Sequence, residues 1–349
     1  MKIAIAGNDE RQRQLFEIMN DKGYYVTLYD TDINTSANIS TNISTNTSTS
    51  TNINTNTGAN TDANTDANLP VTGAASWHER LAGFDTIILP LPYTRDNERI
   101  CTLPSLTIDA LSDICRQKSI FLGSGSGFID DRITSSASTY YDYNSSEEFQ
   151  YINARMTAEA ALSLAIQKLP ISLFGSHIAV VGYGRIGTFL SEMLSLMGAN
   201  VTVYARKERD LARAVAHGYS IVDISNGLPS VAKEITDGNE RGGEKNNSDK
   251  NEENRENGIY KEKATGIKQL PDAIFNTAPA RIFNRENSLL LSNCPLFDLA
   301  GKGSCLEYCG EVVPLLSLPS RISPVSAALA VFCGIEDKLG KIGKKTNSK

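Results

Sequence analysis

The segment Ile178-Ala-Val-Val-Gly-Tyr-Gly-Arg-Ile-Gly187 decides the fold of this chain. Its apolar start predicts a buried strand, and Gly182, Gly184 and Gly187 follow with the spacing G-x-G-x-x-G. The first glycine of this motif permits a tight turn, and the second lets a pyrophosphate approach the backbone. The third lets the following helix pack closely against the strand.

The residues that follow supply the context that the bare motif lacks. Residues 190–197 predict an amphipathic helix, and residues 199–204 predict a second strand. Free N–H groups at the start of such a helix bind a pyrophosphate, because the helix dipole favours negative charge there. The segment therefore predicts a dinucleotide-binding Rossmann unit, and a glycine-rich turn without a ligand is the alternative. The predicted cofactor-binding residues of the turn are Gly182, Tyr183, Gly184, Arg185, Ile186 and Gly187.

The end of the second strand indicates which dinucleotide binds. An acidic residue there usually accepts a hydrogen bond from the ribose 2′-OH of NAD. This chain has Tyr204-Ala-Arg-Lys207 instead, and Arg206 is able to bind a 2′-phosphate bidentately. We therefore predict NADP rather than NAD, with Arg206 and Lys207 in the site. Ordinary solvated charges at a strand end are the alternative interpretation.

The composition excludes several classes of protein. The chain has 349 residues and a formal net charge of −6, which argues against nucleic acid or an anionic membrane as partner. No apolar run approaches the roughly 18 residues of a membrane span, and the N-terminus starts directly as a strand without a signal peptide. Six scattered cysteines indicate a cytoplasmic thiol state. Cys305 and Cys309 leave a zinc site as a minor alternative, and we predict no metal.

The N-terminal part predicts a second α/β domain. Residues 2–30 read as strand, helix and strand, but their first turn has only one glycine, so we expect a substrate-side domain. Further strands are expected at 84–90 and 119–122, with a helix at 106–115. Repeated strand–helix units imply a parallel sheet. The turns at 7–11, 90–95 and 123–127 are then expected to open at one edge of that sheet.

Two tracts lack the composition of a packed core. Residues 34–68 are mostly Asn, Thr and Ser, and residues 237–258 contain no hydrophobic residue. Such sequences do not offset their ordering entropy, so both are predicted to be disordered insertions. An adhesive or aggregating tract is the alternative for 34–68.

The remaining elements complete the predicted domain organisation. Residues 153–168 predict an amphipathic linking helix, strands are expected at 219–222, 273–276 and 295–300, and an alanine-rich helix is expected at 325–332. A basic tail from Lys338 is expected to fray. The predicted divisions are a substrate-side domain (1–150), a linking helix (151–172), an NADP-binding domain (173–318) and a C-terminal segment that returns to the first domain (319–349).

Several motifs together resemble one family. The chain resembles the A subunit of dipicolinate synthase in the segments Gly7-Asn-Asp-Glu-Arg-Gln12, Tyr151-Ile-Asn-Ala-Arg-Met-Thr-Ala-Glu159, Gly175 to Gly187, Gly198 to Arg206, Asn276-Thr-Ala-Pro279 and Asp298-Leu-Ala300. The resemblance implies two Rossmann-like, doubly wound parallel-sheet domains with the active site in a cleft between them. This architecture is similar to that of the 2-hydroxy-acid and formate dehydrogenases.

The resemblance also implies a reaction and partners. The reaction is oxidation of dihydrodipicolinate, formed from 4-hydroxytetrahydrodipicolinate, to dipicolinate during sporulation, with NADP⁺ taking the hydride. The partners are a small cyclic dicarboxylate and a flavoprotein-like B subunit of the synthase, and a homo-oligomer is left open.

The resemblance assigns candidate site residues. A dicarboxylate requires cationic or N–H donors, and aromatisation requires a route for one proton. The expected catalytic residues are Thr157 and Glu159, the latter only if burial raises its pKa. The candidate substrate-binding residues are Asp9, Arg11, Arg155 and Arg281, and the further cofactor-binding candidates are Asn276, Thr277 and Pro279.

Two other functions stay open on the sequence. A 2-hydroxy-acid dehydrogenase uses a histidine late in the cofactor domain, and this chain has no histidine after His217. A non-catalytic NADP-binding regulatory protein is the second alternative, because no obvious acid–base pair is present.

Overall fold

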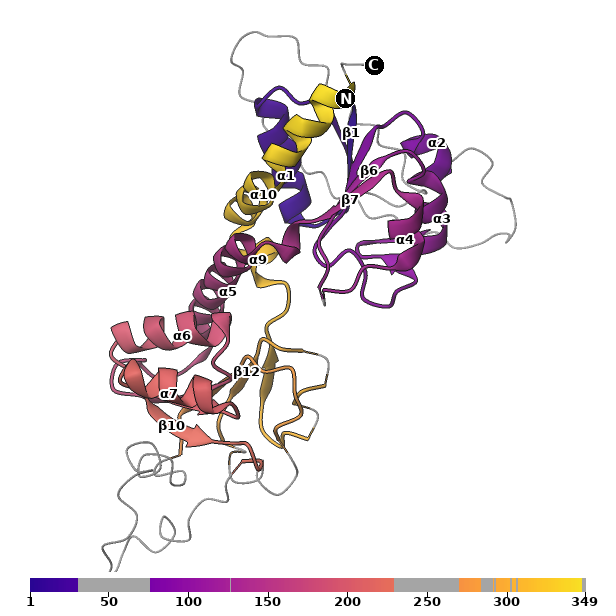
Figure 1. The fold of residues 1–349 in the computed structure, drawn as a ribbon. Coiled ribbons are helices and arrows are strands. Elements are labelled where there is room, and N and C mark those ends of the chain that lie inside the picture. Colours follow the sequence, from indigo (N-terminus) through magenta and orange to yellow (C-terminus); the bar gives the residue numbers. More distant parts are fainter. Residues whose placement is uncertain are drawn as a thin grey trace, which may run out of the picture. The chain divides into compact units, whose positions relative to one another are not determined.

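The computed structural model describes most of the chain as two compact units (Figure 1). Unit 1 comprises Met1–Asn144 with Lys338–Lys349, and unit 2 comprises Ser145–Asp337. The described residues are 1–30, 76–125, 127–228, 270–283, 291, 293–301, 303–305 and 307–346. The predicted disordered tracts at 34–68 and 237–258 lie outside these residues.

Unit 1 contains a five-stranded sheet in the order β2-β1-β3-β6-β7, in which every neighbouring pair is parallel. The strands are β1 (Ile3–Ala6), β2 (Val26–Tyr29), β3 (Thr86–Ile88), β6 (Ser119–Leu122) and β7 (Thr139–Asp142). A separate antiparallel pair is formed by β4 (Arg99–Ile100) and β5 (Leu103–Thr107). The helical elements are α1 (Glu10–Asp21), α2 (Trp77–Leu81), α3 (Ile108–Ile114), α4 (Asp131–Ser136) and the 3-10 turn η1 (Tyr143–Ser145).

The local sequence explains why these elements form. The strands β1, β3 and β6 are buried along their whole length, as expected for central parallel strands that are covered on both faces. Helix α1 begins after Asp9, whose side chain accepts a hydrogen bond from the backbone N–H of Gln12. Helix α2 begins with a capping box formed by Ser76 and Glu79.

Unit 2 contains a six-stranded parallel sheet in the order β10-β9-β8-β11-β12-β13. Its strands are β8 (His177–Val181), β9 (Asn200–Ala205), β10 (Ser220–Asp223), β11 (Ala273–Asn276), β12 (Leu296–Asp298) and β13 (Val312–Pro314). Its helices are α5 (Glu147–Lys168), α6 (Arg185–Leu196), α7 (Glu208–Ala216), α9 (Leu318–Ile322) and the first part of α10 (Pro324–Thr346). Two parallel-sheet α/β units confirm the predicted fold class.

Small residues let α5 and α6 pack closely in unit 2. The α5 residues Ala158, Ala161 and Ala165 are fully buried and share one core cluster with Leu190 and Leu194 of α6. Alanine is also the best helix former, so the same residues favour both the helix and its close packing. The core of this unit therefore includes the helix that follows the glycine turn, together with Tyr183 of the turn itself.

Two helix boundaries differ from the predictions. Helix α5 begins at Glu147, six residues before the predicted start, because Ser146 caps it by accepting a hydrogen bond from the N–H of Phe149. The predicted fraying from Lys338 is wrong, since α10 continues to Thr346. There Leu339 is fully buried and the Lys338 ammonium lies 5.4 Å from the centre of the Tyr141 ring, so both residues tie this part of α10 to unit 1.

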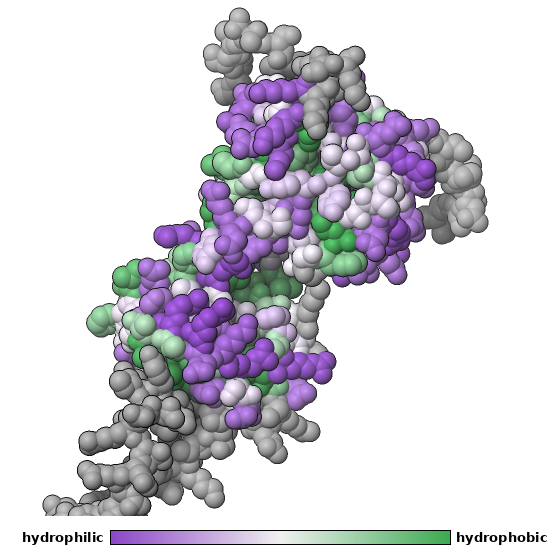
Figure 2. All heavy atoms as spheres, in the orientation of Figure 1, coloured by the Kyte–Doolittle hydropathy of each residue, from purple (hydrophilic) through white to green (hydrophobic). Residues whose placement is uncertain are grey.

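The surface of the described residues is mainly hydrophilic on the face that Figure 2 draws. Figure 2 shows one face of the molecule, on which hydrophilic residues predominate over both units. Among the described residues, no helix is long and apolar enough to cross a membrane.

Candidate functional site

The predicted glycine turn connects β8 to α6 in unit 2. Gly182 has φ +93°, a left-handed value that L side chains rarely adopt. Gly184 is the N-cap of α6 and supplies no side-chain hydrogen bond to the first turn of the helix. The N–H groups of this turn are therefore left for an external acceptor, which is the arrangement that binds phosphate.

The surroundings of the three glycines match their expected roles. A Cβ at Gly187 would lie 2.2 Å from the carbonyl oxygen of Gly182, so only glycine lets α6 approach β8 this closely. A Cβ at Gly182 would lie 2.6 Å from Thr277 Oγ1. A Cβ at Gly184 would meet nothing within 4 Å. The second glycine is thus required by no contact with the described residues, which leaves space for a ligand.

The side chain of Tyr183 supports the turn instead of facing a ligand. It is buried, and its hydroxyl lies 2.7 Å from His217 Nδ1. Burial raises the pKa of Tyr183 to about 12, so the hydroxyl stays protonated, and it shares a hydrogen bond with the His217 ring. The Arg213 guanidinium donates to the carbonyl oxygen of Tyr183. Only the backbone of Tyr183 is therefore left for a cofactor.

The end of β9 presents the two predicted cations. Arg206 and Lys207 are exposed, and neither forms an ion pair with any described residue. The nearby Asp210 is paired with Arg209 and Arg213. Arg206 and Lys207 are therefore available for an anionic ligand.

The turn after β11 is hydrogen-bonded to the glycine turn. Thr277 Oγ1 donates to the carbonyl oxygens of Val181 and Gly182 at 2.9 Å and 3.3 Å. Asn276 is fully buried, and its Nδ2 donates to Asp298 Oδ1 at 2.9 Å and to Ser304 Oγ at 3.0 Å. The Thr277 side chain thus holds the glycine turn, Asn276 contacts residues after β12, and Pro279 is exposed.

Three residues of this network, Asp298, Ser304 and Cys305, were not predicted as site residues. Asp298 also accepts from the N–H groups of Ala300 and Gly301, and Cys305 Sγ lies 3.3 Å from Asn276 Nδ2. Burial raises the pKa of Cys305 to about 11, so its thiol stays neutral. The only sequence signal was the polar residue that ends each of two neighbouring strands, Asn276 and Asp298.

We expect Thr277→Val to loosen the glycine turn with little change in the volume of the side chain. Loss of the hydroxyl removes the donor that the Val181 and Gly182 carbonyl oxygens share, which is expected to lower stability by about 0.5–1.5 kcal/mol and to weaken dinucleotide binding a few-fold. Denaturant unfolding and fluorescence titration with NADPH measure the two effects. Thr277→Ser keeps the hydroxyl and is the control. Unchanged stability and affinity in Thr277→Val would contradict the bracing role.

The candidates on α5 lie on two different faces of the helix. Arg155 and Glu159 form an ion pair at 3.3 Å, and their side chains are 61% and 52% exposed. Thr157 is buried and donates from Oγ1 to the carbonyl oxygen of Asn153 at 2.7 Å. The burial that a proton-accepting Glu159 requires is absent from this structure. Arg281, another substrate-binding candidate, is exposed.

The predicted meeting of three turns at one edge of the unit 1 sheet is confirmed. A Cβ on Gly7, after β1, would lie 3.6 Å from Pro90 Cβ, after β3. A Cβ on Gly123, after β6, would lie 2.7 Å from Leu91 Cβ and from the Tyr143 hydroxyl oxygen. The carboxyl ends of β1, β3 and β6 therefore converge, as parallel strands require.

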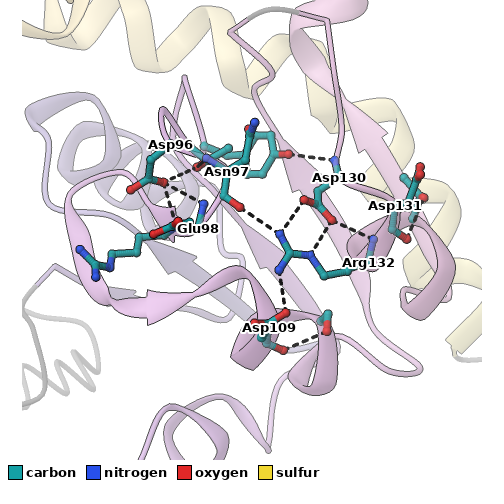
Figure 3. Close-up of polar contacts among 12 residues, drawn as sticks. Asp96, Asn97, Glu98, Asp109, Asp130, Asp131 and Arg132 are labelled. Carbon is teal, nitrogen blue, oxygen red and sulfur yellow. Dashed lines mark hydrogen bonds and ion pairs between the residues drawn. The ribbon is translucent and has the colours of Figure 1, made fainter.

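Ion pairs and hydrogen bonds hold the turn that follows β3 (Figure 3). Arg132 donates from Nε and Nη2 to the two carboxylate oxygens of Asp130, and from Nη1 to Asp109 at 2.7 Å. It also donates to the carbonyl oxygen of Asn97 at 2.9 Å. The N–H of Asp130 donates to the hydroxyl of Tyr93, which belongs to the same turn. Arg132 thus connects this turn to α3 and α4.

We expect Arg132→Met to lower the melting temperature in a pH-dependent way. The hydrogen bonds from Arg132 hold the pKa of Asp130 below its usual value. Their stabilisation is therefore present above the unfolded pKa of about 3.9 and is lost as the pH falls through the lower folded pKa. Thermal unfolding followed by circular dichroism should show a clear difference from wild type at neutral pH that shrinks in acid. Arg116→Met, which breaks an exposed ion pair with Asp113, should change little. A difference that grows in acid would contradict this account.

Comparison with known proteins places these features in context. No family model matches the chain. In sequence, 139 residues are 29% identical to the A subunit of dipicolinate synthase from Bacillus subtilis (strain 168), covering 38% of this chain and 47% of that protein. The resemblance to dipicolinate synthase is confirmed. The matched part spans about half the length of that relative.

Two solved dipicolinate synthase structures share the fold. The crystal structure of the Bacillus subtilis protein has a TM-score of 0.61 and 18% identity, covering 99% of this chain and 97% of that chain. The crystal structure of the corresponding Bacillus halodurans protein has a TM-score of 0.61 and 18% identity, covering 97% of each chain. At this identity the agreement concerns the fold that these dipicolinate synthase proteins share.

Proposed function

We propose that this chain is an NADP-dependent dehydrogenase that oxidises dihydrodipicolinate to dipicolinate during sporulation. The observation that carries the proposal is the glycine turn between β8 and α6, where the N-terminus of α6 has no side-chain cap and Gly184 faces open space. The sequence match to dipicolinate synthase suggests the substrate.

The residues of unit 2 fit an NADP molecule. The backbone at Gly182–Gly187 would hold the pyrophosphate, and the exposed side chains of Arg206 and Lys207 would hold the 2′-phosphate. Thr277 would keep the turn in register through its contact to Gly182, and Asn276 would hold the end of β11 through its contact to Asp298. Bound NADP⁺ would supply the hydride acceptor.

The reaction needs few functional groups from the protein. Dihydrodipicolinate loses one hydride and one proton, and the product is an aromatic pyridine ring. Aromatisation favours the product, so orientation of the substrate carries much of the catalysis. We propose that Thr157 helps to position the substrate, and we assign no residue to the proton, because Glu159 lacks the burial that this role requires.

The name of the Bacillus subtilis relative suggests that this chain has a partner subunit. That protein is named as one lettered subunit of a synthase, which implies a second subunit. We propose that this chain works in the cytoplasm with a flavoprotein-like B subunit. Its substrate is proposed to be a small cyclic dicarboxylate.

An absorbance assay tests the proposed function. The chain is mixed with NADP⁺ and with dihydrodipicolinate generated in situ, and NADPH and dipicolinate are detected separately. Stoichiometric appearance of both products is the expected result. NADPH binding without turnover, even in the presence of the B subunit, would refute the proposed activity and favour a non-catalytic NADP-binding protein.

A further inference from the structure

A buried arginine lies at the carboxyl edge of the unit 1 sheet. Arg11, in the first turn of α1, is 3% exposed. Its Nε and Nη1 atoms are shielded from solvent and have no acceptor among the described residues. These two atoms carry most of the N–H donors of a guanidinium that is always charged. Buried charges in proteins are normally paired, so this arginine requires an explanation.

The carboxylates around Arg11 are engaged elsewhere. Asp9 caps α1 by accepting from the N–H of Gln12. Glu10 accepts from Arg13 and Gln14. Asp142 accepts from Ser124 and Asn144. None of these carboxylates forms an ion pair with Arg11 in the described part of the chain.

The position of Arg11 on its helix is unfavourable for a cation. The N-terminus of a helix carries a partial positive charge, so a cation in the first turn is unfavourable unless an anion lies beside it. Helix α1 has 12 residues, and Arg11 is the second of them. The neighbouring Gln12 is also buried, and its Oε1 atom has no donor among the described residues. The first turn of α1 therefore presents unused donors and one unused acceptor next to the Gly7 turn.

We propose that Arg11 binds a carboxylate group of the small-molecule substrate at this edge of the sheet. This inference rests on the proposed function for the identity of that substrate. A guanidinium gains charge-assisted hydrogen bonds to a carboxylate, and these are stronger where solvent is excluded. Burial raises the pKa of the neighbouring Tyr143 hydroxyl, the Arg11 charge lowers it, and Asp9 and Asp142 add smaller increases. A planar carboxylate matches two parallel N–H donors of a guanidinium, which favours a carboxylate as the bound group.

Burial distinguishes Arg11 from the other two predicted substrate-binding arginines. Arg155 is exposed and paired with Glu159, and Arg281 is exposed. Exposed side chains keep their hydration and gain little from a single ligand contact. Arg11 is therefore the residue of the three whose surroundings favour a bound anion.

Calorimetric titration of the full chain with pyridine-2,6-dicarboxylate tests this inference. Arg11→Met should weaken binding by about 10- to 100-fold, as expected for loss of a charge-assisted hydrogen bond. Arg11→Lys keeps the charge but loses the planar donor geometry and should give an intermediate loss. Arg13→Met is the matched control, because Arg13 lies on the same helix but is half-exposed and paired with Glu10 and Asp30. It should bind like wild type.

A second measurement separates ligand binding from a structural role. Without ligand, Arg11→Met should melt at or above the wild-type temperature, because it removes a buried guanidinium whose Nε and Nη1 donors have no acceptor among the described residues. Unchanged affinity in Arg11→Met, or a lowered melting temperature without ligand, would overturn the inference. Equal binding of inorganic phosphate through Arg11 would also overturn it. NADPH titration of the same variants should be unchanged, so failure of the cofactor proposal is seen independently of this site.

Discussion

Gly184→Val is expected to abolish dinucleotide binding while leaving the fold intact. A side chain at this position would occupy the space through which the pyrophosphate approaches the first turn of α6. Each lost charge-assisted hydrogen bond costs about 1.5–3 kcal/mol, so loss of two would weaken binding by roughly 100-fold or more. Fluorescence titration with NADPH measures the affinity, and thermal unfolding without ligand measures the fold.

Gly187→Val provides the contrasting variant for this experiment. Its side chain would collide with the backbone of Gly182, 2.2 Å from Cβ, so both stability and binding should fall. The two variants separate the glycine that admits the ligand from the glycine that admits the helix. NADPH affinity retained in Gly184→Val would disprove the assignment of this turn as the pyrophosphate site.

Arg206→Asp is expected to reverse the preference between the two nicotinamide dinucleotides. The change removes a cation from the end of β9 and adds a carboxylate, which repels a 2′-phosphate and accepts a hydrogen bond from a 2′-OH. Loss of the charge-assisted bond alone corresponds to about 10- to 100-fold weaker NADPH binding, while NADH binding should improve. Parallel titrations with NADPH and NADH measure the ratio of the two affinities.

Arg209→Asp is the matched control for this charge change. Arg209 is also exposed and follows closely in α7, but it contacts Asp210 and lies beyond the strand end. Its replacement makes the same change in net charge and should leave the ratio unchanged. An equal shift in both variants would mean that overall charge, and not a contact with Arg206, sets the preference.

The sequence predicted those parts of the fold that depend on neighbouring residues. The strands at 119–122 and 273–276 were predicted at their observed bounds, because continuous apolar runs between turn residues form buried parallel strands. The glycine turn was predicted from its spacing and is found between β8 and α6. The strand β7 was missed, since the alternation in Thr139–Asp142 is short and its tyrosines are polar enough to resemble a loop.

The C-terminal segment shows where local reasoning failed. The basic residues from Lys338 onward predicted a frayed tail, yet the helix continues to Thr346. Burial of Leu339 and the contact between Lys338 and Tyr141 stabilise this helix from outside its own sequence. Tertiary packing overrides local propensity in such cases.

The sequence by itself determined that the chain has a dinucleotide-type turn, parallel α/β units and a cationic strand end. These features arise from residues within a few positions of one another, whose periodicity and turn chemistry act locally. Only the tertiary structure decided that Thr277 contacts the glycine turn, that Asn276 contacts Asp298, that Tyr183 faces inward, and that Arg11 is buried without an acceptor among the described residues. Those properties depend on which strands become neighbours, because parallel strands bring together turns that are distant in the chain.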